Sequence, residues 1–173
     1  PDTPFLTVAK ALSVAQSGDA IEIGAGTYVE TFPLVVPDGV HVRGSGIRQT
    51  EIKPTGGTND LNASVLNGDT TIEDLTVRDF FYNSTNDTGY GFVCANNCNS
   101  SRSAYIQRVT ILNKGSVVTG SDPYGFQQGD AGRGAKLDGS IASSANIEAA
   151  VLFKECRFSV PNSIGVYLTN GIR

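Results

Sequence analysis

Ile72-Glu73-Asp74-Leu75-Thr76-Val77 recurs in its pattern of apolar and polar residues as Ile106-Gln107-Arg108-Val109-Thr110-Ile111 and again as Phe153-Lys154-Glu155-Cys156-Arg157-Phe158. The copies begin 34 and 47 residues apart. Similar strands at unequal intervals are typical of a solenoid, because each turn repeats its inner strands while the connecting loops vary in length. We therefore predict parallel strands whose Ile, Val and Leu side chains stack as an inward ladder.

Shorter segments elsewhere support the same architecture. Ile21-Glu22-Ile23, Leu34-Val35-Val36 and Val40-His41-Val42 are short apolar-rich runs closed by Gly or Pro. Tyr90-Gly91-Phe92 returns 34 residues later as Tyr124-Gly125-Phe126, which indicates the same repeat unit. Two-residue hairpin loops, which a sandwich or propeller would use, are not the rule. The predicted fold is all-β: a right-handed, single-stranded parallel β-helix.

A second series of segments ends strands with a turn. Asn-Gly and Asp-Gly accept a positive φ at low cost, so they suit sharp corners between strands. The three segments of this series are Leu66-Asn67-Gly68, Leu137-Asp138-Gly139 and Leu168-Thr169-Asn170-Gly171.

One amphipathic helix is predicted before the first strand. Val8, Ala11, Leu12 and Ala15 fall on one helical face between Thr7 and Gln16, with Thr7 placed as the N-cap and Gly18 as the terminator. We expect residues 1–18 to cap the open end of a single domain. Residues 19–173 would form its turns, with long loops near 80–103, 113–134 and 138–149. Because the sequence starts at Pro1 and contains no Met, we expect a piece of a longer chain.

Composition argues against several classes of partner. The 173 residues carry a net charge of −4, and the Lys and Arg residues are scattered singly, so nucleic acid is not expected to bind. No apolar run is long enough to span a membrane, and no secretory leader is visible. Zinc would need ligands beyond the two thiolates of Cys94 and Cys98, and the lone His41 is not predicted nearby. We therefore expect neither a metal nor another cofactor.

The sequence resembles two groups of known proteins. The first half looks like the opening of pectate-lyase-like β-helix proteins, and the second half resembles structural proteins of tailed cyanobacterial phages. The first resemblance rests on Thr7–Leu12, Gly18–Ile23, Gly26–Glu30 and Val40–Gly44. The second rests on Tyr90–Cys94, Tyr105–Thr110, Asp122–Phe126, Gly129–Ala135 and Leu168–Gly171. The second resemblance implies a virion component of the tail, baseplate or fibre class, an assembly that is commonly trimeric.

Asp74, Arg108 and Glu155 are the candidate catalytic residues. They occupy one equivalent position in the three strand copies, so they should stack as an acid, a base and an acid. Pectate lyases use calcium-binding carboxylates and an Arg that removes a proton, whereas hydrolases need two carboxylates about 5 to 9.5 Å apart. Because the middle member is Arg, the pattern favours surface ion pairing over catalysis. Arg78 and Asp79 are further candidates.

Aromatic and cysteine residues supply the candidate contact sites. Tyr90, Phe92, Tyr124 and Phe126 are expected in or beside Gly-rich loops, where they would contact another subunit, stack on a glycan or anchor the loops. Cys94 and Cys98 would close a small disulfide ring in an oxidising compartment, and otherwise stay as thiols. Cys156 aligns with Leu75 and Val109, so it should point into the core.

The leading hypothesis is a noncatalytic virion structural protein that provides a rigid module for assembly or host-surface contact. It predicts other virion proteins as partners, a homotrimer, a host-surface glycan as a further partner, and a place in the extracellular particle. The alternatives are a polysaccharide lyase or hydrolase and a carbohydrate-binding adhesin module, since a fold alone does not decide function.

Overall fold

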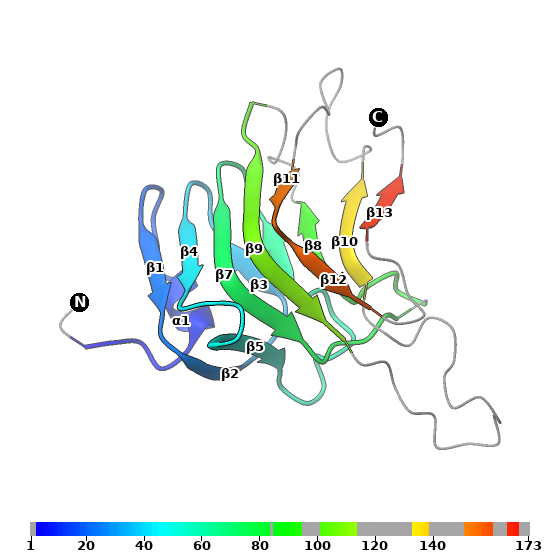
Figure 1. Ribbon diagram of the computed structural model, residues 1–173, viewed down its shortest axis with the longest axis horizontal. Coiled ribbons are helices and arrows are strands. Elements are labelled where there is room, and N and C mark those ends of the chain that lie inside the picture. Colours follow the sequence, from blue (N-terminus) through cyan, green and yellow to red (C-terminus); the bar gives the residue numbers. More distant parts are fainter. Residues whose placement is uncertain are drawn as a thin grey trace.

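A computed structural model describes residues 3–83, 85–94, 101–113, 133–138, 151–160 and 166–169. Strands wind through successive turns of a solenoid, which we call rungs (Figure 1). Rung 1 contains β1 (Ala20–Ile23), β2 (Gly26–Glu30) and β3 (Leu34–Val36), and rung 2 contains β4 (His41–Gly44), β5 (Thr50–Pro54) and β6 (Ser64–Leu66). Rung 3 contains β7 (Thr71–Arg78) and β8 (Tyr90–Cys94), and rung 4 contains β9 (Ala104–Leu112) and β10 (Arg133–Asp138). Rung 5 contains β11 (Val151–Lys154), β12 (Arg157–Ser159) and β13 (Val166–Thr169).

Every pairing between these named strands is parallel, and the strands form two sheets. An eight-stranded sheet holds β1, β2, β4, β5, β7, β9, β11 and β12, and a five-stranded sheet has the order β13-β10-β8-β6-β3. Figure 1 shows the first sheet in front, with β1, β4, β7 and β9 side by side, and the second behind it. The predicted right-handed parallel β-helix is confirmed.

The strand copies seen in the sequence are in register. Ile72 lies opposite Ile106, and Ile106 lies opposite Phe153. Val42 extends this row toward the N-terminus, and Val42, Ile72 and Ile106 are buried between the sheets. Each fully buried side chain of this size contributes about 1.5–3 kcal/mol of transfer free energy, so these rows form the core of the domain.

The N-terminal helix α1 is shorter than predicted, because it spans only Val8–Leu12. Thr7 is its N-cap as expected, and its hydroxyl accepts a hydrogen bond from the Lys10 N–H at 3.1 Å. The helix does not reach Gln16 because the Asp19 carboxylate accepts the Gln16 N–H at 2.8 Å and turns the chain toward β1. The buried Glu30 carboxylate accepts the Val8 and Ala9 N–H groups at 2.6 and 3.2 Å, which fixes the helix start on β2.

Two details of the predicted organisation were wrong. The loop expected at 80–103 contains β8, so it is not one continuous loop. The pairing of Tyr90-Gly91-Phe92 does not follow a 34-residue repeat, because Tyr90 lies opposite Arg133 and Phe92 opposite Ala135. Residues 124–126 lie outside the described residues, as do nearly all of the loops expected near 113–134 and 138–149.

Candidate functional site

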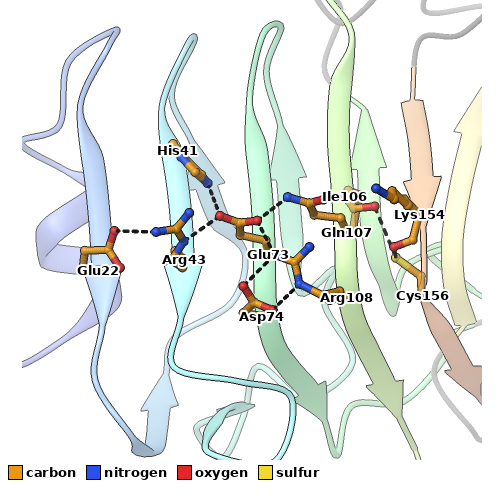
Figure 2. Close-up of polar contacts among 10 residues, drawn as sticks. All are labelled: Glu22, His41, Arg43, Glu73, Asp74, Ile106, Gln107, Arg108, Lys154 and Cys156. Carbon is orange, nitrogen blue, oxygen red and sulfur yellow. Dashed lines mark hydrogen bonds and ion pairs between the residues drawn. The ribbon is translucent and has the colours of Figure 1, made fainter.

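A row of polar side chains crosses the outer face of the eight-stranded sheet. Its members are opposite one another in successive rungs, and we call them the wall row: Glu22, Arg43, Glu73, Gln107 and Lys154. They point outward because side chains alternate along a strand and their neighbours Val42, Ile72 and Ile106 point into the core. The charges alternate from Glu22 through Arg43 to Glu73 (Figure 2).

Glu73 is the buried centre of the wall row, with only 2% of its side chain exposed. Arg43 Nε donates to Glu73 Oε1 at 2.6 Å, and an Arg108 terminal nitrogen donates to Oε2 at 2.7 Å. His41 Nε2 lies 2.9 Å from Oε1, and the Gln107 amide donates to Oε2. Figure 2 shows these four side chains converging on the carboxylate from β4 and β9.

The pKa of Glu73 reflects two opposing effects. Burial raises the pKa, but the hydrogen bonds from Arg43, Gln107 and His41, together with the positive charge of Arg43, outweigh burial and lower it to about 2. The carboxylate is therefore ionised at neutral pH and acts only as an acceptor, so His41 carries a proton on Nε2. A group with this pKa cannot act as a general acid near neutrality.

The predicted row of Asp74, Arg108 and Glu155 is present at a bend in the sheet. All three residues have positive φ, of 58°, 49° and 55°, which turns the strand sharply at the same point in three rungs. Asp74 and Arg108 lie between the register pairs Glu73–Gln107 and Leu75–Val109. In rung 2 the place of Asp74 is taken by Gly44, where an added Cβ would clash with the Asp74 carbonyl oxygen, so a side chain does not fit at this position.

Arg108 is held by the two acids of β7. Two of its nitrogens donate hydrogen bonds to the Asp74 carboxylate, at 2.6 and 2.8 Å, and one of them also donates to Glu73. Its hydrogen bonds to Asp74 and Glu73 raise the pKa of the guanidinium, against a lowering by burial. Arg108 is therefore a fixed cation that joins rungs 3 and 4. Glu155, the third member of the row, is exposed.

The other polar candidates also take part in structural contacts. Arg78 donates from Nε to the Glu51 carboxylate at 2.8 Å and pairs with Asp79. Cys156 is half-buried against the core, as its alignment with Val109 predicted, and burial raises the pKa of its thiol. In the described ranges, no group of three or more His, Cys, Asp and Glu side chains could hold a metal ion. Of the helices in the same ranges, none has the length and hydrophobicity to cross a membrane.

The predicted contact role of Tyr90 and Phe92 is wrong. Both point into the core from β8, with 0% and 2% exposed, because the stretch is a strand with alternate residues inward. The Tyr90 hydroxyl donates to Asp87 at 2.7 Å, and its ring meets Tyr82 edge-on, so the residue anchors a loop. Tyr124, Phe126 and Cys98 lie outside the described residues, as does the side chain of Cys94, so the disulfide stays a prediction.

The five-stranded sheet presents a different outer wall. Val35, Val65 and Val93 lie opposite one another in successive strands, with Val35 exposed and the other two half-buried. In the backbone register, Lys136 of β10 is opposite Val93, and Tyr167 of β13 is opposite Lys136. In the part of the row that the structure describes, no residue is a carboxylate.

Glu73 was missed by sequence reasoning, although a signal was present. Glu22, Arg43 and Glu73 each follow an inward apolar residue at the same strand position, so opposite charges should stack. The neighbouring Asp74 aligned with Arg108 and Glu155 in the strand copies, so the sequence analysis selected that row and not the row of Glu73.

Comparisons with known proteins address the fold. A family model described as "Protein of unknown function (DUF1565)" matches residues 1–121. Among solved structures, a pectin methylesterase D178A mutant in complex with hexasaccharide IV is similar, with a TM-score of 0.54 and 16% sequence identity. The match covers 89% of this chain and 45% of the esterase chain, so the chain spans less than half of that protein. No curated protein sequence matched the chain. At this identity, the likeness concerns the fold alone.

Proposed function

Since the chain belongs to the DUF1565 family of right-handed β-helix proteins, we propose that it is a noncatalytic structural module. One observation carries the proposal: Glu73, the most buried acid of the wall row, joins three rungs through Arg43, Gln107 and Arg108. Such a network gives stiffness to a solenoid whose rungs contact only their neighbours. It leaves these groups occupied rather than available to a substrate.

The chemistry of the predicted catalytic row also favours a structural role. A lyase that used Arg108 as its base would need the guanidinium to lose a proton, and Asp74 and Glu73 oppose this by raising its pKa. A hydrolase would need Asp74 free as a nucleophile or base, but both of its oxygens accept hydrogen bonds from Arg108. The enzyme alternative therefore has no support from this row.

We place the module in a phage particle, as a component of the tail, baseplate or fibre. The support is the resemblance of the second half of the sequence to structural proteins of tailed cyanobacterial phages. On this proposal its partners are other virion proteins and two further copies of the chain in a homotrimer. A host-surface glycan is a further proposed ligand.

Two measurements on the purified protein test the proposal. The first is an assay for reducing ends, unsaturated products and methanol released from pectin and other polysaccharides, for which we expect no turnover above buffer. Turnover that Asp74→Asn or Arg108→Gln abolishes, while circular dichroism stays unchanged, would overturn the noncatalytic proposal.

The second measurement is the mass of the protein in solution, by light scattering across a dilution series. A stable trimer is expected, and a monomer at all concentrations would count against the virion assignment.

A further inference from the structure

An apolar groove lies at the N-terminal end of the β-helix, between α1 and the first rung. Its volume is about 590 Å³. One wall is formed by the segment leading into α1 and by the helix and the turn after it, and the other by β1 and β2. The lining includes Phe5, Val14, Ala20, Ile21, Glu22 and Tyr28.

The groove exists because α1 covers the core incompletely. Ile21 and Tyr28 belong to inward rows whose next members, Val42 and Ile52, are buried. Ile21 and Tyr28 themselves are only half-buried, although α1 buries Val8 and Leu12 against the same core. On the opposite wall Phe5 and Val14 are 43% and 48% exposed. Two apolar walls therefore face each other across a space that the described residues do not fill.

One side of the groove is the free edge of β1. Among the described strands, β1 pairs only with β4, and the Asp19 carbonyl accepts the His41 N–H at 2.9 Å. The backbone N–H and C=O groups of successive strand residues point to opposite sides of the strand. The backbone groups of Ile21 therefore face β4, whereas those of Ala20 and Glu22 face the open edge. Such an edge accepts another strand, since its backbone groups have no partner in the sheet.

The charge at this edge specifies the kind of strand. Glu22 ends the wall row, with 64% of its side chain exposed and Arg43 at 3.7 Å on its β4 side. Glu22, Arg43 and Glu73 alternate in charge. A strand added at the edge of β1 would continue this alternation only if its residue opposite Glu22 were basic. Opposite charges directly across neighbouring strands stabilise a sheet, and like charges destabilise it.

We propose that this groove binds an extended segment of a partner protein, which pairs with β1, places apolar side chains against Ile21 and Tyr28, and sets a Lys or Arg beside Glu22. The chain supplies a template for such a segment in Gly39–Ser45, because β4 makes the equivalent contacts on the other side of β1. Its inward Val40 and Val42 are apolar, and its outward Arg43 meets Glu22.

The test uses a fluorescent synthetic peptide with the sequence of Gly39–Ser45 and the whole chain, measured by fluorescence anisotropy. We expect saturable binding, and roughly fivefold weaker binding of the same peptide with Glu in place of Arg43, the size of a cross-strand charge effect. Glu22→Lys should reverse this preference. Glu155→Lys makes the same charge change at an exposed residue of rung 5 and should leave it unchanged.

Ala20→Pro provides the backbone control. Proline removes the one N–H that Ala20 directs to the open edge and is tolerated on edge strands, so the variant should keep its melting temperature and lose the peptide. Equal binding of both peptides, or unchanged binding by Ala20→Pro, would overturn the proposal. Self-association of the unliganded protein that Ala20→Pro abolishes would also overturn it, because a second copy would then occupy the edge.

Discussion

The middle of the β-helix and its N-terminal end use the same rows of residues with different results. Ile72 and Ile21 belong to one inward row, yet Ile72 is buried and Ile21 is half-exposed. Glu73 and Glu22 belong to the wall row, yet Glu73 has partners on both sides while Glu22, among the described residues, forms an ion pair only with Arg43. The difference shows that a rung between two neighbours completes burial and charge pairing, whereas a terminal rung does not.

The largest expected effect comes from the inward row. Ile72→Ala should lower the free energy of unfolding by about 4 kcal/mol, because it leaves a cavity between two rungs. Ile21→Ala removes the same atoms at the open groove and should cost about 1–2 kcal/mol. Urea unfolding followed by circular dichroism measures both. Equal losses would show that the terminal rung is as well packed as the middle.

The wall row should show the same contrast between its buried and exposed acids. Glu73→Ala should destabilise the fold by about 3 kcal/mol, at the low end for a broken buried pair, since Arg43 and Arg108 can still reach water. Glu22→Ala removes one exposed ion pair and should change stability by less than about 0.5 kcal/mol. The same unfolding experiment distinguishes them, and a loss for Glu22→Ala as large as that for Glu73→Ala would show that burial of the acid does not decide its contribution.

Acid should act on the middle of the sheet through Glu73. Its pKa of about 2 in the folded protein lies below the ordinary value of 4.5, so its stabilising contribution is complete above pH 4.5. That contribution should disappear as the pH falls from about 5 to about 2, at a cost on the order of 2–3 kcal/mol. Between about pH 5 and pH 2, the free energy of unfolding should fall more steeply for the wild-type chain than for Glu73→Gln. Parallel dependence on pH would refute this role of Glu73.

A smaller and more local effect is expected at the cap of the terminal rung. Thr7→Ala removes the hydroxyl that accepts the Lys10 N–H and should cost about 1 kcal/mol. Hydrogen exchange should speed up at α1 and β1 and stay unchanged at β7 and β9. Uniform acceleration would mean that the end and the middle unfold as one unit.

The sequence predicted what depends on periodicity. The row of Ile72, Ile106 and Phe153 follows from matching strand copies, and the same alignment placed Asp74 opposite Arg108 and pointed Cys156 inward. These properties follow from the repeat, because strand copies that share one pattern stack in register. The N-cap at Thr7 was equally readable, since it depends on residues within one turn of helix.

Contacts that depend on loop lengths or on long side chains reaching across from neighbouring rungs could not be predicted in the same way. Tyr90 and Phe92 are buried because they lie on the inward face of β8, in a stretch that the sequence analysis expected to be a loop. The pairing of β8 with β10 could not be predicted, because the Tyr-Gly-Phe repeat suggested another spacing. Glu73 is buried because long side chains from β4 and β9 cover it, not because of its own strand pattern. The early end of the helix accompanies a turn in which Gln16 and Asp19 hydrogen-bond each other, and helical periodicity does not indicate such a turn.

The pKa of Glu73 is the most direct test of the claim that the wall charges hold the rungs together. A carbon-13 NMR titration of the side-chain carboxyl, assigned by comparison with Glu73→Gln, would measure it in the folded chain. We expect a pKa of about 2, well below the ordinary value of 4.5. A value at or above 4.5 would contradict it, because the carboxyl would then be either unpaired or suited to proton transfer.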